Sequence, residues 1–143
     1  MSAIKTVKGE IFIDERGKIA SLNNFSFDEV KRIYFIHHPD TSVYRGWHGH
    51  QLEKKWFYCI KGKMRIDTIQ IDNWEKPNPN LVPETYYLEE NVSQIIYVPG
   101  GYVNCIKAET KDAILLVLSD VLYQDCQEDS WRYAFDYFVH YKK

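Results

Sequence analysis

Two histidines separated by a single residue, His48 and His50, are the part of this sequence best suited to chemistry. They follow Arg45 and Gly46 in a short segment that begins at Tyr44. In a β-strand, alternate side chains share a face, so both imidazoles would point the same way. Neutral imidazole is both a common metal ligand and a base that titrates near neutral pH. The pair is therefore either half of a metal site or a pair of groups that transfer protons.

The elements that must position this pair are short strands, because alternating or apolar runs separated by turn residues cover most of the chain. The expected strands are residues 11–14, 18–22, 30–37, 43–50, 56–60, 64–71, 86–88, 93–98, 102–107 and 113–118. The segments 14–17 and 61–63 predict hairpin turns, and three prolines within residues 72–84 indicate an excursion between strands. Some ten short strands are typical of a β-sandwich or a small barrel, whose mouth holds one ligand.

Two further predictions concern the second half of the chain. The unbroken apolar run 113–118 predicts a strand that is covered on both faces. The aromatic tail 129–141 is expected to hold one helical turn or to lie extended over the core.

Composition limits the class of protein. A length of 143 residues suits one domain, residues 1–143, and a formal net charge of -2 gives no basic field for nucleic acid. No apolar run approaches the roughly 20 residues that a membrane span needs, and the first residues lack the apolar core of a signal peptide. Cys59, Cys105 and Cys126 are widely spaced, which predicts reduced thiols and a cytoplasmic location.

Two blocks accompany the histidine pair, one containing Lys55 and Gly62 and the other running from Pro99 to Asn104. Together with the pair they resemble the two motifs of the cupin superfamily, which implies an all-β jelly-roll barrel, the double-stranded β-helix. Metal-binding cupins carry Glu and His where this chain has Lys55 and Asn104. A charged ammonium has no free lone pair, and an amide is a weak ligand for transition metals. We therefore expect no metal and no cofactor, although Glu53 stays open as an atypical ligand.

Within the cupins, the segment 45–50 resembles the Arg-Gly-Leu-His of the dTDP-4-dehydrorhamnose 3,5-epimerases and the Arg-Gly-Phe-His-Ala-His of the WxcM-like dTDP-sugar 3,4-ketoisomerases. Lys55 and the turn 14–17 are similar to the epimerases, whereas the ending, residues 115–138, is similar to the ketoisomerases. The resemblance covers roughly residues 11–138. Asn104 departs from both groups, which have His there, and Leu116 aligns with the acid tyrosine of the epimerases.

The resemblance implies an isomerase that acts on a dTDP-linked 4-keto-6-deoxyhexose through an enediolate, with the 3,4-ketoisomerase type ahead of the 3,5-epimerase type. His48 would be the base at C3, His50 its partner in proton transfer, and Lys55 a cation that stabilises the enediolate together with Arg45. Both enzyme groups are dimeric, which implies a homodimer. The residues expected to bind the nucleotide sugar are Arg16, Tyr34, Arg45, Tyr102 and Asn104.

Two alternatives stay open. Asn104 and the missing tyrosine also favour a non-catalytic cupin that binds a sugar or a sugar nucleotide, and a metal-dependent cupin with an atypical ligand shell is the other. If the protein is an enzyme, Tyr34, Tyr44 or Tyr102 could replace the acid tyrosine.

Overall fold

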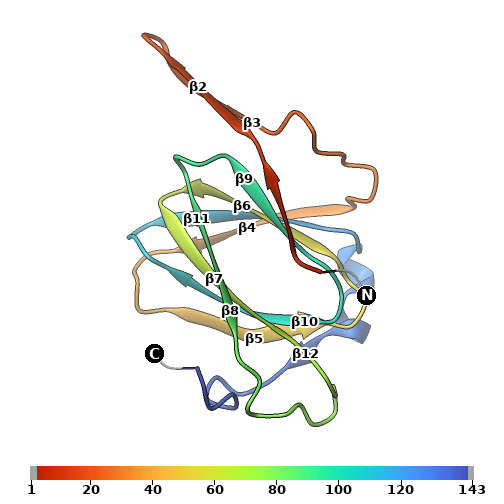
Figure 1. The fold of residues 1–143 in the computed structure, drawn as a ribbon. Helices are drawn as coiled ribbons and strands as arrows, with labels where there is room; N and C mark the ends of the chain where they lie inside the picture. The colour runs from red at the N-terminus through yellow and green to blue at the C-terminus, as the bar shows by residue number, and fades with distance from the viewer. Residues whose placement is uncertain (1–2, 142–143) are drawn as a thin grey trace.

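In the computed structural model, which describes residues 3–141, two five-stranded antiparallel sheets face each other across the core (Figure 1). The first sheet has the order β1 (Lys5–Lys8), β9 (Gln94–Val98), β6 (Lys55–Lys61), β11 (Ala113–Ser119) and β4 (Arg32–His38). The second has the order β12 (Trp131–Arg132), β5 (Tyr44–His50), β10 (Tyr102–Ala108), β7 (Lys63–Gln70) and β8 (Glu84–Glu89). This arrangement confirms the predicted jelly-roll barrel. The domain expected over 1–143 includes residues 1–2 and 142–143, which lie outside the described residues.

The core lies between the two sheets because alternate residues of each strand point inward. Phe57 of β6 and Leu115 and Val117 of β11 meet Ile66 of β7 and Ile106 of β10, and all five are almost fully buried. The core fills one part of the barrel with large apolar side chains. The remainder is left to polar residues.

The prediction for residues 113–118 was correct about the strand but wrong about its covering. The inward side chains of Ala113, Leu115 and Val117 are fully buried, whereas Ile114 and Leu116 on the other face are only half-buried. Leu116 and Leu118 form a shallow apolar groove with the segment that follows β3. The run is apolar on both faces, but the outer face is fully covered only at Leu118, which is buried with Trp56 and Ile95.

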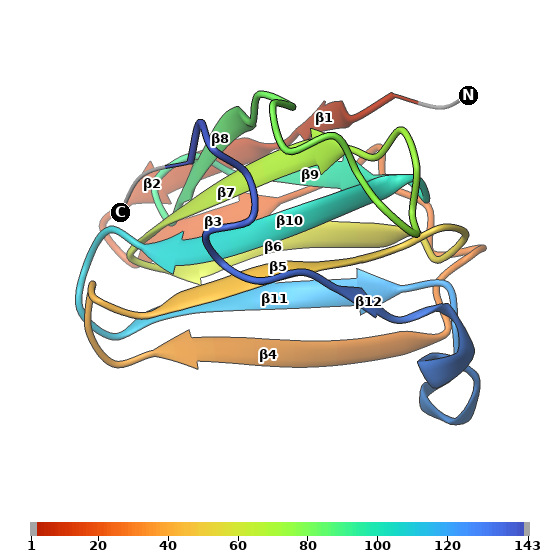
Figure 2. The same ribbon diagram turned by 90° about the horizontal axis from the view of Figure 1, so that it is seen from below.

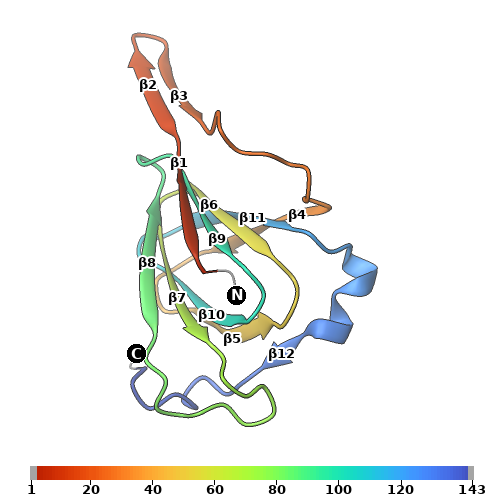
Figure 3. The same cartoon turned by 45° about the vertical axis from the view of Figure 1, so that its right-hand side comes forward.

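β2 (Glu10–Asp14) and β3 (Gly17–Ser21) pair only with each other and project from the barrel (Figures 1 and 3). The expected hairpin and its turn are confirmed. The sequence did not predict β1, since Lys5 to Lys8 carries little apolar pattern. Its backbone pairs with β9 and continues into the hairpin.

The C-terminal segment wraps the second sheet (Figures 2 and 3). Two short 3-10 turns, Tyr123–Asp125 and Gln127–Asp129, lead into β12, which pairs with β5. Beyond β12, Phe138 is fully buried and packs edge-on against Trp47. The two 3-10 turns end at Asp129, where the predicted tail 129–141 begins, so the tail follows the second option: it lies over the core as β12 and turns, without a helix. Within residues 3–141, no helix is long and apolar enough to cross a membrane.

Candidate active site

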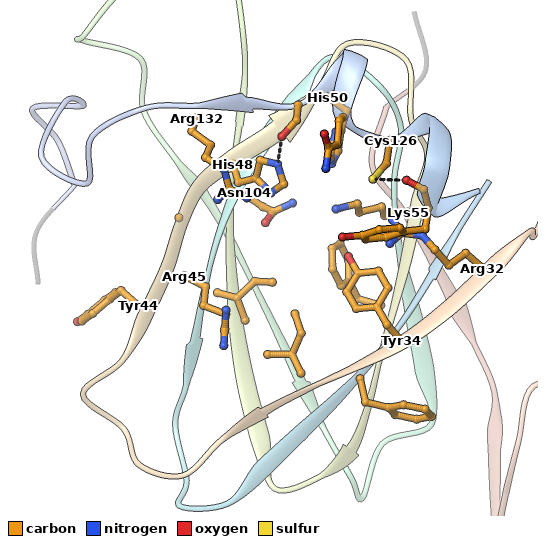
Figure 4. A pocket seen from close by; sticks show the side chains of 18 of the residues that line it. Arg32, Tyr34, Tyr44, Arg45, His48, His50, Lys55, Asn104, Cys126 and Arg132 are labelled. Atoms are coloured by element: carbon orange, nitrogen blue, oxygen red, sulfur yellow. Dashed lines mark hydrogen bonds between the residues drawn. The ribbon is translucent and has the colours of Figure 1, made fainter. Parts of the chain in front are cut away.

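A cavity of about 730 Å³ opens between the two sheets, beside the 3-10 turns. β5 and β10 form one wall, and β4 and β6 form the facing wall. In Figure 4 the side chains of His48, His50, Lys55 and Tyr34 converge on this space, whereas the Tyr44 ring points away from it, towards Phe135 and Tyr141. The polar residues that line it are Arg32, Tyr34, His37, Tyr44, Arg45, His48, His50, Lys55, Asn104, Tyr123, Gln127, Ser130 and Arg132.

The two histidines lie side by side on the inner face of β5. Their ring centroids are 4.8 Å apart, as expected from the alternation of side chains along a strand. Asn104 of β10 is the register partner of His48 and lines the same wall. The side-chain amide of Asn104 therefore lies on the same wall of the cavity as the two imidazoles.

Two consecutive residues at the end of the second 3-10 turn, Asp129 and Ser130, hold both imidazoles. Ser130 Oγ lies 2.8 Å from His48 Nε2, and the carbonyl oxygen of Asp129 lies 2.6 Å from His50 Nδ1. A carbonyl only accepts hydrogen bonds, so His50 carries its proton on Nδ1 when it is neutral. His50 Nε2 then bears the lone pair, and this buried atom has no hydrogen-bond partner among the described residues.

The Asp129 carboxylate fixes this dipeptide to the end of β5. It accepts hydrogen bonds from the backbone N–H groups of Gln51, Leu52 and Glu53 at 2.8, 2.8 and 3.1 Å. Charge-assisted hydrogen bonds of this kind are stronger than neutral ones. The positions of both histidine rings therefore depend on a contact between distant parts of the chain.

Cations and tyrosines form the facing wall (Figure 4). Lys55, at the start of β6, is only 7% exposed, and its Nζ lies 5.8 Å from the centre of the Tyr34 ring. The guanidinium of Arg32 lies over the rings of Tyr34 and Tyr123, at 4.9 and 5.7 Å from their centres. Arg32, Tyr34 and Lys55 thus come from the wall opposite the imidazoles, and Tyr123 joins them from the first 3-10 turn.

The electrostatics of the cavity favour an anionic ligand. Arg32, Arg45, Lys55 and Arg132 line it, and none of its lining residues within 3–141 is Asp or Glu. Burial, followed by the charges of Lys55, His50 and Arg132, lowers the pKa of His48 to about 3. Both imidazoles are consequently neutral near pH 7, because burial and Lys55 also lower the pKa of His50.

Glu53 lies beneath this cavity, with a side chain that is 1% exposed. Its carboxylate faces Nδ1 of His50, whereas the unpartnered Nε2 is on the other side of the ring. Because Glu53 is on the Nδ1 side of the ring, it cannot join a metal that the two histidines would bind through their Nε2 atoms. No group of three or more His, Cys, Asp or Glu side chains within residues 3–141 is arranged to hold a metal ion.

The structure brings most of the expected residues together. His48, His50, Lys55, Tyr34, Arg45 and Asn104 all line the cavity. Arg16 does not, because the projecting hairpin carries it outward, where its side chain is 77% exposed and pairs with Asp14. Tyr102 does not either, because it packs against the apolar core. Neither residue lines the cavity of its own chain, and a binding role for each stays a prediction.

The alignment of Leu116 with an acid tyrosine also needs correction. Leu116 lies on the outer face of β11, in the apolar groove, so no residue at that position reaches the cavity. The inward residues of β11 are Ala113, Leu115, Val117 and Ser119, and none is a tyrosine. Tyr34, Tyr44 and Tyr123 are the tyrosines that line the cavity.

Sequence reasoning missed several lining residues. Arg32 lies two positions before Tyr34 on the same strand, so strand alternation alone could have found it. Ser130 and Arg132 carry no such signal, since they reach the site only through the pairing of β12 with β5.

Comparisons with known proteins identify the family and agree with the fold. The family model FdtA, described as WxcM-like, C-terminal, matches residues 2–143. The structure of QdtA, a sugar 3,4-ketoisomerase from Thermoanaerobacterium thermosaccharolyticum in complex with TDP, superposes with a TM-score of 0.72 at 22% identity, covering 94% of this chain and 91% of that one.

WlaRB, a TDP-quinovose 3,4-ketoisomerase from Campylobacter jejuni, gives a TM-score of 0.69 at 22% identity over 96% of this chain and 98% of its own. The dTDP-4-dehydrorhamnose 3,5-epimerase of Bacillus anthracis gives 0.76 at 14% identity over 93% and 79%. At these identities the likeness establishes the fold. No curated protein sequence matches the chain.

Proposed function

Because the chain belongs to the WxcM-like, C-terminal family represented by FdtA, we propose that it is an isomerase of a dTDP-linked 4-keto-6-deoxyhexose, of the 3,4-ketoisomerase type. One observation carries the proposal. Two neutral imidazoles, 4.8 Å apart, face Lys55 across a cavity lined by cations and by no carboxylate. The solved 3,4-ketoisomerase QdtA, which has the same fold, was crystallised with TDP.

The reaction moves the ketone from C4 to C3. A proton leaves C3, an enediolate forms, a proton is added at C4, and the hydroxyl proton passes from O3 to O4. Substrate and product have the same composition, so the reaction consumes no oxidant. It requires a base within reach of C3 and a proton donor near C4 and the two oxygens, together with positive charge near the enediolate.

The contacts suggest how the residues divide these tasks. We expected His48 to be the base, but the unpartnered Nε2 of His50 is the better proton acceptor, because its Nδ1–H is held by Asp129. His48, hydrogen-bonded to Ser130, is then the partner that passes protons between the oxygens. Lys55 stabilises the enediolate, and Arg45 and Arg32 bind the diphosphate. Asn104 and Tyr34 orient the sugar.

The expected homodimer is supported by large apolar side chains that are exposed to solvent in a single chain. Phe12, Ile13 and Ile19 of the projecting hairpin are 59–72% exposed, and Ile33 and Phe35 on the outer face of β4 are more than half exposed. Apolar surface of this kind marks association sites. Arg16, in the turn of the hairpin, would contact a nucleotide sugar only in the cavity of a second copy. The three unpaired cysteines support the proposed cytoplasmic location.

The test is incubation with dTDP-4-keto-6-deoxyglucose in heavy water, followed by NMR. We expect the 3-keto product with deuterium at C4, deuterium at C3 in any 4-keto substrate that re-forms from the enediolate, and no reaction from a His50→Asn variant that still folds and binds substrate. If the wild-type protein binds this nucleotide sugar and yields neither product nor deuterium, the non-catalytic binding cupin that Asn104 favours is the correct alternative.

A further inference from the structure

Glu53 is a buried carboxylate that no step of the proposed reaction uses. Its Oε2 accepts a hydrogen bond from Ser119 Oγ at 2.8 Å and lies 3.4 Å from the guanidinium of Arg32. Nζ of Lys55 is 4.0 Å away. Its other oxygen, Oε1, is buried without a hydrogen-bond partner among the described residues. A buried carboxylate with a free oxygen is costly unless a neighbouring group uses it.

The group nearest to that oxygen is His50. Glu53 Oε1 lies 3.6 Å from His50 Nδ1, the nitrogen that donates to the Asp129 carbonyl. When Nε2 accepts a proton, the positive charge spreads over the ring and reaches Nδ1. The carboxylate then faces the positive end of a buried imidazolium.

Lys55 acts in the opposite sense. It is 7% exposed, lies in the wall that faces the histidines and lowers the pKa of His50, as burial does. Glu53 and Asp129 raise that pKa. A cation needed for the enediolate would thus weaken the base beside it, unless a negative charge lay close to both. Glu53 is that charge, because its Oε2 lies 4.0 Å from Nζ of Lys55 and its Oε1 lies 3.6 Å from Nδ1 of His50.

We propose that Glu53 is a positioning residue of this site: its carboxylate is the buried counter-charge that lets His50 accept a proton beside Lys55. The inference rests on the proposed function for its kinetic consequence, while the titration of His50 can be observed without any substrate. The charged groups that act on His50 are Lys55 on β6, Glu53 and Asp129. His48 lies beside its ring on β5, and Tyr102 is its register partner on β10. Arg32 on β4 pairs with Glu53, and Arg132 on β12 is the register partner of His48.

The first experiment is an NMR titration of the histidine side chains in ¹⁵N-labelled protein. Wild type should show His50 as the Nδ1–H tautomer. In a Glu53→Gln variant its titration midpoint should fall by about 1 pH unit or more, because an opposite charge at this distance is removed. Ser119→Ala is the matched control, since it removes a contact of Glu53 but keeps the charge. Its midpoint should stay within a few tenths of wild type.

The second experiment is kinetic. In Glu53→Gln we expect kcat to fall on the order of tenfold or more with KM within about twofold, since Glu53 lines no part of the cavity. The acid limb of kcat/KM should move to lower pH, because a base with a lower pKa stays deprotonated further into acid. If Glu53 only stabilised the fold, the variant would contain less active enzyme, but the acid limb of its kcat/KM profile would stay at the wild-type pH.

Two outcomes overturn the inference: an unchanged His50 midpoint in a folded Glu53→Gln protein, or an acid limb that does not move. If that variant does not fold, Glu53→Asp decides, because the shorter side chain draws the carboxylate away from Nδ1. An unchanged midpoint there also overturns the inference. An inactive wild type with a shifted midpoint in the variant would instead refute the proposed function alone.

Discussion

The Nε2 atom of His48 lies 2.8 Å from the hydroxyl oxygen of Ser130, a residue 82 positions further along the chain. The neighbouring Asp129 holds His50 in the same way through its carbonyl oxygen. One short segment therefore sets the orientation of both imidazoles. The rings are placed by β5, but their hydrogen-bonding states depend on the C-terminal part of the fold.

Replacing Ser130 by Ala should lower kcat about fivefold and leave KM nearly unchanged, because His48 loses one hydrogen bond worth about 1 kcal/mol. Steady-state kinetics with the keto sugar nucleotide measure this. Ser130→Thr keeps a hydroxyl group and should retain most of the activity. Equal losses in the two variants would show that the hydroxyl is not the feature that matters.

Replacing Asp129 by Ala should lower both stability and activity, because three backbone N–H groups lose their acceptor. We expect the free energy of unfolding to fall by about 1–3 kcal/mol, measured by urea denaturation. Asp125→Ala, an exposed position in the same segment, is the control and should change stability by less than about 0.5 kcal/mol.

Lys55→Met should reduce kcat on the order of 100-fold, because the removed ammonium is the cation whose charge acts on both imidazoles and would stabilise the enediolate. Lys54→Met offers a matched control, since Lys54 points outward and pairs with Glu29. That variant should keep wild-type kinetics. Comparable kcat values in the two variants would remove Lys55 from the mechanism.

Stability should depend on pH through His48. Its pKa in the folded protein is about 3, below the 6.5 of an ordinary histidine, so the unfolded chain binds more protons between these values. The contribution of His48 is therefore fully present above pH 6.5 and is lost as pH falls towards 3. Between pH 6.5 and 4.5, wild type should lose up to about 1 kcal/mol more per pH unit than His48→Gln. Parallel unfolding curves against pH would contradict a buried neutral His48.

Ile13→Lys should dissociate the proposed homodimer, because it places a charge on the exposed apolar face of the projecting hairpin. Sedimentation should then give a mass near the 17.0 kDa of one chain. Val82→Lys, an exposed apolar residue on the other sheet's side of the molecule, should leave the dimer intact. A wild-type protein that sediments as a monomer would end this proposal.

The sequence alone determined the features that depend on local periodicity. Alternation places His48 and His50 on one face of β5, and the turn residues define the hairpin at residues 14–17. The hairpin predicted at residues 61–63 is wrong, because β6 and β7 on either side of it belong to different sheets. The second motif predicted that Asn104 would join them, and the register of β10 against β5 agrees. These features follow from the strand repeat and from turn chemistry, which act within a few residues.

Only the tertiary structure decided which distant side chains complete the site. Pairing of β12 with β5 brings Ser130 and Arg132 to the histidines, and the facing sheet contributes Lys55 and Arg32. The same packing turned Glu53 away from the cavity, towards Nδ1 of His50, and directed Leu116 outward. Sequence spacing does not encode such contacts, because closure of the barrel and burial of charge fix them through the chain as a whole.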